Sequence, residues 1–427
     1  MPFRNRNYRL LWIANLMASF AGQVSMIAFP LVAVRNLHAA EWEMGVLVAV
    51  EVLPFVLFSL PAGTLVDRLP THKVVTAALA SLTAVTVIVP LSFALGVLHM
   101  GGLYVAGFLM GSVMCVEGVA SQVLTTELVS RQGLVKANAW LMGTESGLKL
   151  VAPAAAGVLI ETVGAPGTLW VEVVLLAIAV AVLSRMQHTA VRQRPAASAT
   201  WPLIREGLQV VRRSPVLRAA AAVTMIWQLL WHGVYALLVL YATRDLALSA
   251  LQLGLATACG AAGVLAGTLL AGRVDRAFGL GRGMLIGLAT AGAGWGLMAL
   301  APPAHAFVAF ALAYVVMDFG LTLGFVCYIS LRQAVTADEL LGRVTATMRW
   351  LSLLLAPLGS AMFGGIAQHA GMTTAFAIAS MGCIVLMVLA AFGALARRDR
   401  SAPHVWAVTG NAPSPSRGEN AATIAER

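Results

Sequence analysis

Twelve long apolar segments constrain the fold of this chain more than any other feature. They lie at 9–34, 44–66, 74–97, 101–125, 138–160, 167–184, 217–242, 251–272, 283–301, 305–331, 343–366 and 373–395. A helix of about 20 apolar residues crosses the hydrocarbon core of a bilayer, so each segment is long enough to span it. The sequence therefore predicts an all-α membrane protein of twelve transmembrane helices, arranged as six, a break and six.

The distribution of charge gives this protein an orientation. Of the 427 residues, 59% are apolar, and the net charge is +10. Of the 28 Lys and Arg, 24 fall on the face that holds both termini, Arg35 and Arg244 fall on the other, and Lys149 and Arg349 lie within segments. Basic loops stay in the cytoplasm. We therefore expect a multi-pass inner-membrane protein with both termini cytoplasmic, and the positive charge does not indicate a nucleic-acid partner.

Four regions follow from this pattern. We predict an N-terminal six-helix bundle over 1–184, a cytoplasmic linker over 185–216, a C-terminal six-helix bundle over 217–395, and a disordered cytoplasmic tail over 396–427. Within the linker, Leu203, Ile204, Leu208 and Val211 share one helical face. The linker is therefore expected to contain an amphipathic helix at the cytoplasmic leaflet, with a solvated linker as the alternative.

The two halves contain a repeated motif. Gly63 leads to Asp67-Arg68 after the second segment, and Gly272-Arg273-Val leads to Asp275-Arg276 after the eighth, with the Asp-Arg pairs 208 positions apart. The repeat predicts two pseudo-symmetric bundles. An Asp at a helix end can accept hydrogen bonds from the first amides of a neighbouring helix. We expect a conformational latch at the cytoplasmic end, formed by Gly63, Asp67, Arg68, Asp275, Arg276 and Arg343; charges that only fix topology are the alternative.

Several short stretches resemble the major facilitator superfamily, in particular its bacterial exporter branch of enterobactin exporters and macrolide or multidrug efflux proteins. They are Asn5-Arg-Asn7-Tyr8-Arg9-Leu-Leu-Trp12, Glu51-Val-Leu-Pro54, Glu127-Leu-Val with Ala137-Asn138, Gly207-Leu with Arg212-Arg213-Ser-Pro215, and Gln333 with Gly342-Arg343-Val344. The resemblance extends from Asn5 to about Ala396. It implies the major facilitator fold, a small-molecule substrate and proton-coupled export.

The sequence departs from the family pattern at three places. After Asp67-Arg68 it continues Leu69-Pro70-Thr71-His72-Lys73, which reduces the basic part of the latch. The helix 5 motif of antiporters appears with Pro153 and Gly157, but alanines replace two of its glycines. Relatives often carry an acid at the position of Gln23. These departures weaken the expectation of antiport, and a facilitator or a proton-coupled importer of a small metabolite stays open.

Charged residues inside the segments are the first candidates for mechanism, because burying a charge in a bilayer is costly. The resemblance implies that helices 1, 4, 7 and 10 line a central cavity, and that 2, 5, 8 and 11 form the interface between halves. Asp318 lies about 20 Å along its helix, near the midplane. Asp318 and Glu117 are therefore our proton-coupling candidates, followed by Glu145.

The remaining buried charges have structural alternatives. Glu145 and Lys149 are four residues apart, so a salt bridge competes with a relay. Arg349 takes the place of Glu145 when Pro357 is aligned on Pro153, and it is expected to pair with an acid of the other half. Glu51 is an interhelical candidate like Lys149 and Arg349. For Glu172, close to the outer end of its helix, we expect water or snorkelling to solvate the carboxylate.

Polar and aromatic side chains in two helices predict a substrate cavity. Helix 7 carries Trp227, Gln228, Trp231, His232 and Tyr235 far from the interfaces where aromatic belts lie. Such a wall would suit a bulky, partly apolar ligand, with helix packing as the competing interpretation. Helix 1 carries a polar stripe of Asn15, Ser19 and Gln23, which could face the same cavity or bind a neighbouring helix.

No motif predicts an enzyme, a metal or a cofactor. The chain has no phosphate-binding loop and no H-E-x-x-H, and its four cysteines form no C-x-x-C pair. A membrane-embedded transferase would be expected to show acidic or His clusters in one sizeable loop. We therefore expect a monomeric secondary transporter that exports amphiphilic small molecules such as a drug, antibiotic or siderophore-like metabolite, in exchange for protons and with alternating access.

Overall fold

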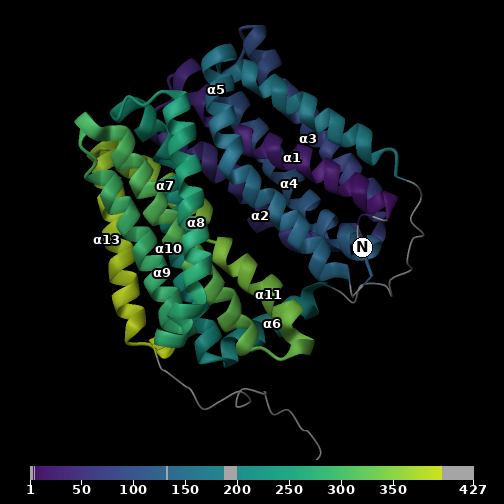
Figure 1. Cartoon of the computed structure of the whole chain (residues 1–427), viewed down its shortest axis with the longest axis vertical. Helices are drawn as coiled ribbons and strands as arrows, with labels where there is room; N and C mark the ends of the chain where they lie inside the picture. Colours follow the sequence, from purple (N-terminus) through teal and green to yellow (C-terminus); the bar gives the residue numbers. More distant parts are fainter. Residues whose placement is uncertain (1–2, 4, 131–132, 187–199, 397–427) are drawn as a thin grey trace, which may run out of the picture.

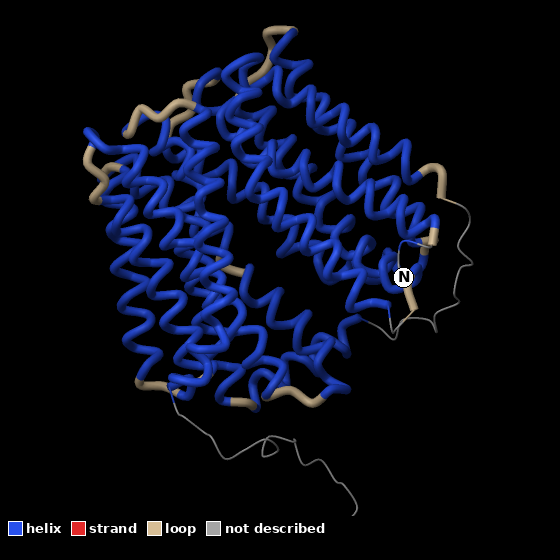
Figure 2. Tube along the Cα trace, in the orientation of Figure 1, coloured by secondary structure: helices blue, strands red, loops and turns tan. Residues whose placement is uncertain are grey.

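The computed structural model describes residues 3, 5–130, 133–186 and 200–396. The predicted tail lies outside these residues, as does most of the first part of the linker. Every regular element described is helical (Figure 2). The α-helices are α1 (Arg6–Leu31), α2 (Glu41–Arg68), α3 (Thr71–Ala94), α4 (Met100–Leu128), α5 (Leu134–Leu183), α6 (Thr200–Arg213), α7 (Pro215–Leu240), α8 (Ala250–Phe278), α9 (Leu280–Ala299), α10 (Ala306–Ala334), α11 (Asp338–Leu353), α12 (Ala356–Ala370) and α13 (Met372–Ala391).

The twelve predicted spans correspond to these helices with two differences. Within the described residues, ten helices are long and apolar enough to cross a membrane, and α5 counts once although it contains two spans. Gly164 separates its two arms with a φ of 77°. The second difference concerns α9, which is not among the ten because Arg282 and its glycines lower its hydropathy. Counting both arms of α5 and adding α9 gives the expected twelve.

The eleventh span is broken, which its hydropathy did not predict. α11 ends at Leu353 and α12 begins at Ala356, with Pro357 in the first turn of α12. Proline has no amide hydrogen and its ring collides with the carbonyl four residues earlier, so the helix cannot continue unchanged through this point. α11 and α12 therefore form one span with a break near its middle.

The repeat is visible in the backbone. α1 and α7 each end in a π-helical turn, η2 (Val32–Asn36) and η4 (Tyr241–Asp245), which lie 209 positions apart. Each turn is followed by a residue with positive φ, His38 at 52° and Ala247 at 51°; among the described residues no other non-glycine has a positive φ. Such conformations are uncommon for residues with a Cβ. Their repetition confirms that the halves are pseudo-symmetric.

The start of α1 explains part of the family resemblance. The Asn5 side chain accepts from Asn7 N at 2.9 Å and donates to Leu128 O of α4 at 2.8 Å. The fully buried Tyr8 hydroxyl donates to Ala137 O of α5 at 3.0 Å. The two bonds of Asn5 pair an amide at the start of α1 and a carbonyl at the end of α4, which lack partners within their helices, and the Tyr8 bond ties α1 to the first turn of α5. The motif therefore joins α1, α4 and α5 and has a structural role.

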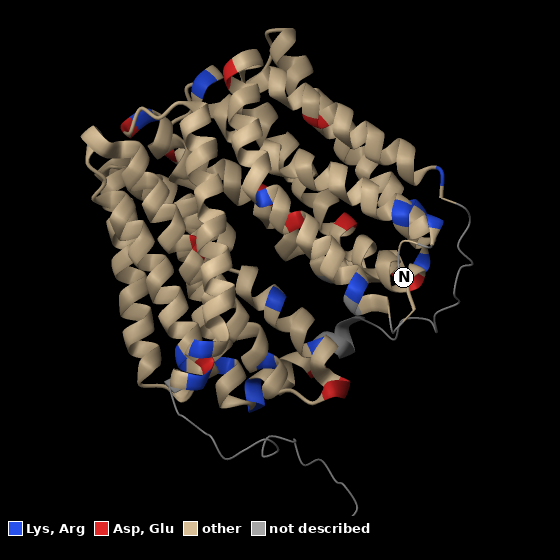
Figure 3. Ribbon diagram, viewed as in Figure 1, with Lys and Arg blue, Asp and Glu red and all other residues tan. Residues whose placement is uncertain are grey.

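The two halves meet at one end and diverge toward the other (Figure 1). α2 packs against α12, and α5 packs against α8, as expected for helices 2, 5, 8 and 11. We call the end with η2 and η4 the closed end. The opposite end, where α1 begins and α6 lies, is the open end. Lys and Arg gather around the open end, and a few charged residues are scattered along the middle of the helices (Figure 3).

Candidate functional site: the closed end and the central charges

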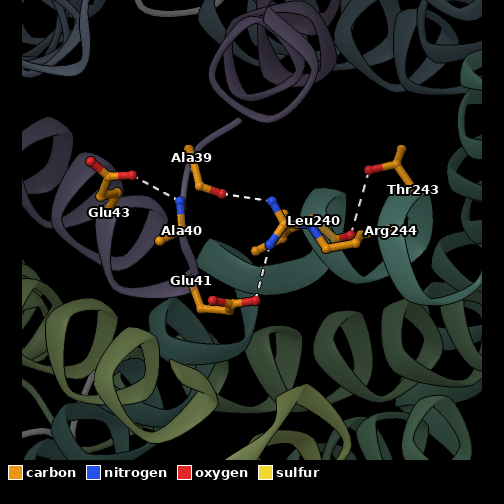
Figure 4. A network of polar contacts seen from close by, with 7 residues as sticks. All are labelled: Ala39, Ala40, Glu41, Glu43, Leu240, Thr243 and Arg244. Atoms are coloured by element: carbon orange, nitrogen blue, oxygen red, sulfur yellow. Dashed lines mark hydrogen bonds and ion pairs between the residues drawn. The ribbon is translucent and has the colours of Figure 1, made fainter. Parts of the chain in front are cut away.

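Arg244 joins the two halves at the closed end (Figure 4). It lies in η4, and its Nη1 is 3.0 Å from Glu41 Oε1 in the first turn of α2. Its Nη2 donates to Ala39 O at 2.8 Å. Glu43 fixes this segment because its carboxylate accepts from Ala40 N at 2.8 Å. One guanidinium of the C-terminal half is thus held by a carboxylate and a carbonyl of the N-terminal half.

A second polar contact between the halves lies at the start of α8. Glu161, near the end of the first arm of α5, accepts from Leu251 N at 3.0 Å and is also bonded to the Ser249 side chain. These partners, together with the nearby Arg35, lower the pKa of Glu161. A carboxylate is favoured at a helix N-terminus because the free amides and the helix dipole stabilise negative charge.

The helix backbones also approach closely at this end. A Cβ on Gly157 would lie 2.6 Å from Ala250 O, and a Cβ on Gly254 would collide with Pro153 O. Pro153 and Gly157, the predicted helix 5 motif, therefore lie in the interface between the halves. Gly45 of α2 makes a similar approach to Gly364 of α12.

The open end has space where the closed end has contacts. A Cβ on Gly63, Gly147 or Gly272 would meet nothing within 4 Å. The predicted latch residues lie at this end, and Arg68, Arg276 and Arg343 are exposed while Asp275 is half-buried. Arg343 Nη1 is 2.7 Å from Glu206 Oε1 of α6. In this conformation the latch arginine Arg343 thus binds the linker helix.

Asp318 and Lys149 are brought together from opposite halves. Asp318 is half-buried on α10, its carboxylate lies against Gly260 of α8, and Lys149 of α5 is its cationic neighbour. Lys149 Nζ is also 3.8 Å from Glu145 Oε1, and both side chains are more than half exposed. The predicted Glu145–Lys149 pair therefore exists, and Lys149 also acts electrostatically on Asp318.

Glu51 and Glu117 lie on the N-terminal side of the same region. The Glu51 side chain packs against Gly107 of α4, and its electrostatic neighbour across the interface is Tyr235 of α7. Asp318 and Tyr235 are both electrostatic neighbours of Tyr314. Glu117 is half-buried with Ser121 beside it. Glu51, Lys149, Tyr235, Tyr314 and Asp318 are therefore electrostatic neighbours drawn from both halves, and we call them the central charges.

The aromatic wall predicted on α7 divides into two parts. Trp227 is only 6% exposed and forms a triangle of rings with Trp231 and Trp295 of α9, with centroid distances of 5.7, 6.2 and 6.3 Å. Trp231 and Tyr235 are half-buried. Packing therefore accounts for Trp227 in this conformation, whereas Trp231 and Tyr235 remain candidates for a cavity wall.

The other cavity candidates have local explanations or partial exposure. His232 Nδ1 is 2.9 Å from Gln228 O of its own helix, so this histidine is satisfied locally. The stripe of Asn15, Ser19 and Gln23 is half-buried. Arg349 is exposed and lies near Cys115 of α4, in the opposite half. The assignment of the histidine and of the polar stripe to a substrate cavity stays a prediction, and so does the pairing of Arg349 with an acid of the other half.

Glu172 contradicts the expectation of solvation. Its side chain is 2% exposed, and it lies about 12 Å along the second arm of α5 from Gly164. Snorkelling requires a path to the interface, and this buried face of the helix offers none. The carboxyl is enclosed by α1 and α3 instead, beside Ser25 and Thr86.

Sequence reasoning missed the contacts of Glu41, Glu161 and Arg244. A usable signal was present, because Arg35 and Arg244 are the two bases on the outer face and lie 209 positions apart. It also missed a hollow of about 480 Å³ at the open end, lined by Ala139, Trp140, Gly143 and Thr144. Trp140 belongs to an apolar helix, and the sequence alone does not distinguish an exposed tryptophan in such a helix from a buried one.

Two six-helix halves that meet at one end and enclose central charges define a class of membrane transporters. The chain matches the model of the Major Facilitator Superfamily over residues 11–244. It belongs to this superfamily, as the short motifs indicated.

The comparisons include relatives with assigned transport roles. The chain is 25% identical over 394 residues to the multidrug efflux pump Tap of Mycolicibacterium fortuitum, covering 90% of this chain and 94% of that protein. It is 27% identical over 387 residues to Tap of Mycobacterium tuberculosis (strain ATCC 25618 / H37Rv), covering 86% and 88%.

Solved transporters share the fold. A mutant of nucleoside transporter NupG superposes with a TM-score of 0.74 at 12% identity, over 90% of this chain and 98% of the other. A bacterial homologue of the iron transporter ferroportin in an inward-facing state gives 0.69 at 16% identity, over 90% and 97%.

Proposed function

We propose that this transporter exports amphiphilic small molecules in exchange for protons, by alternating access. One observation carries the proposal: the described halves are joined at one end by polar contacts that can break and re-form, whereas the other end has open space. Breaking the contacts of Arg244 and Glu161 while closing the open end would expose the central charges to the opposite face.

The orientation follows from the positive-inside rule. The open end carries most of the basic residues, so we assign it to the cytoplasm together with both termini. In this assignment the described conformation faces inward and can accept a substrate from the cytoplasm. A monomer is sufficient, because each half supplies part of the site.

The substrate class rests on the relatives and on the site. Both cited relatives are multidrug efflux pumps. The half-buried Trp231 and Tyr235 offer aromatic faces, and the acids Glu51, Glu117 and Asp318 favour a cationic group. An amphiphilic cation fits this combination of apolar and acidic groups.

Proton coupling is assigned to Asp318, with Glu117 as the second candidate. Lys149 faces Asp318 in this conformation, and moving the halves apart at the closed end would change that distance. A carboxylate that gains and loses a cationic neighbour changes its proton affinity. Proton release at Asp318 can therefore alternate with substrate binding.

Uptake into inverted membrane vesicles tests this proposal. With the vesicle interior acidic, we expect accumulation of ethidium, and nigericin, which collapses the gradient, should abolish it. Asp318→Asn should lower the accumulation by about 5–150-fold, the range of ordinary coupling energies. Glu339→Gln, an exposed acid at the start of α11, is the matched control. Accumulation that is indifferent to the gradient would contradict proton antiport, and full activity of Asp318→Asn would exclude this residue.

A further inference from the structure

Glu172 occupies a buried junction of three helices in the N-terminal half. It is 2% exposed, and Thr168 and Leu176, one turn away on either side, are 0% and 1% exposed. The face of α5 that carries these residues packs against α1 and α3. This junction is separate from the central charges, which lie between the halves.

Among the residues that the structure describes, none at the junction is a cation that could balance a carboxylate. α1 has no charged or titratable residue between Arg9 and Arg35, and α3 has none after Lys73. The second arm of α5 has Glu172 alone, and on α4 the Tyr104 hydroxyl is directed to Glu43 O at 3.5 Å. An unpaired buried charge costs several kcal/mol. The negative form of Glu172 is therefore unfavourable in this conformation.

Hydrogen bonding at the junction can accommodate a protonated carboxyl. Thr86 Oγ1 lies beside Glu172 and 2.9 Å from Leu82 O, and while it donates its single hydrogen to Leu82 O it can only accept from Glu172. A protonated carboxyl has a hydrogen to donate to Thr86, and a carboxylate has none. Glu172 Oε2 is buried and has no hydrogen-bond partner among the described residues. Because this oxygen is unpaired, the proton can move between the two oxygens of the carboxyl group or leave it.

α1 provides a place where the junction can open. Pro30 lies inside α1 and removes the hydrogen bond to the carbonyl of Met26, next to Ser25. The π-helical turn begins two residues later, at Val32. Proline sites and π turns are the usual positions of helix kinks, and π turns are frequent at functional sites. Bending of α1 at the missing bond between Met26 and Pro30, directly next to Ser25, would loosen the contact of Ser25 with Glu172 and give water a path to the carboxyl.

We propose that Glu172 is a second proton-binding site, which holds a proton while the closed end is shut and releases it to water when α1 bends at Pro30. The proton is the ligand, Thr86 Oγ1 accepts its hydrogen bond, and Ser25 completes the site. Proton binding itself does not depend on the direction of transport. The contribution of Glu172 to the coupling of proton flow and export rests on the proposed function.

Infrared difference spectroscopy of the full chain in lipid nanodiscs tests proton binding without any substrate. The wild type should show a carboxylic-acid C=O band that disappears as the pH is raised, and Glu172→Gln should lack it. Thr168→Val is the matched control: Thr168 lies on the same buried face and bonds only Gly164 O of its own helix. If Glu172→Gln does not fold, Glu172→Asp should shift the band. A spectrum unchanged by either substitution would overturn the proposal.

Transport separates this inference from the proposed function. In proteoliposomes, Glu172→Gln should lower gradient-driven ethidium accumulation by about tenfold, within the usual range of coupling. Ethidium counterflow without a gradient should stay near the wild-type rate. Wild-type accumulation by Glu172→Gln would overturn the coupling role of Glu172 and leave proton antiport standing. Failure of the wild type to respond to the gradient would refute the proposed antiport, and the infrared result would still decide whether Glu172 binds a proton.

Discussion

Gly157 and Gly147 lie ten residues apart in α5, and their surroundings are opposite. A Cβ at Gly157 would lie 2.6 Å from Ala250 O and 2.8 Å from Leu251 Cα, whereas one at Gly147 would meet nothing within 4 Å. We expect Gly157→Ala to destabilise the closed end by about 1–3 kcal/mol, because two backbones would have to move apart. Gly147→Ala should be neutral or stabilising by up to about 1 kcal/mol, since alanine favours a helix. Thermal unfolding in detergent measures both, and equal midpoints would show that the close approach is unimportant.

The periodicity of the sequence predicted the helix α6, and packing against other helices fixes its position. Its buried side faces the C-terminal half, where a Cβ on Gly207 would meet Arg343 O at 3.0 Å and collide with Thr347 Oγ1. We expect Gly207→Val to detach α6 from α11 and to speed trypsin cleavage within α6. Gln209→Val, at an exposed position of the same helix, should leave the cleavage rate unchanged.

The ion pair of α6 should contribute less than its packing. Arg343 and Glu206 are each about two-fifths exposed, and exposed pairs contribute less than about 1 kcal/mol. Glu206→Ala should therefore change the trypsin cleavage rate far less than Gly207→Val. A larger effect of Glu206→Ala would mean that charge, and not packing, holds α6 to α11.

The closed end sets the balance between conformations of the whole molecule. Removing the bonds of Arg244 to Glu41 and Ala39 should cost the closed-end contact about 1–2 kcal/mol, a factor of about 5–30 in the conformational ratio. We expect Arg244→Ala to increase the population with separated halves at this end, as measured by electron–electron distances between spin labels on η2 and η4. Thr243→Val is the control, because Thr243 bonds only its own helix. Unchanged distances in Arg244→Ala would show that glycine packing alone holds the closed end.

The sequence predicted the helices better than their breaks. Hydropathy located every span, and the Asp-Arg repeat indicated two related halves. It did not predict that the eleventh span breaks before Pro357, because apolarity continues across the break. Hydropathy also could not show that Glu172 is buried. A buried acid and an acid that reaches water differ only in whether neighbouring helices cover that face of the helix.

The charged residues near the middle of the membrane were predictable, whereas the contacts between the two halves were not. Scarcity of charge identified Asp318, Lys149 and Glu145, because each buried charge in a bilayer is costly enough to be noticed. That Lys149 faces Asp318, and that Arg244 binds Glu41, depends on how two halves of the chain meet.

The sequence by itself determined that this protein crosses a membrane with twelve spans, because hydrophobic length and periodicity act locally along the chain. Its short motifs indicated the superfamily of transporters. Only the tertiary structure decided which end is shut, which charges are neighbours and which carboxyl is sealed from water. Those properties arise from packing between helices far apart in sequence, and helix packing depends on shape and hydrogen bonding that no single segment contains.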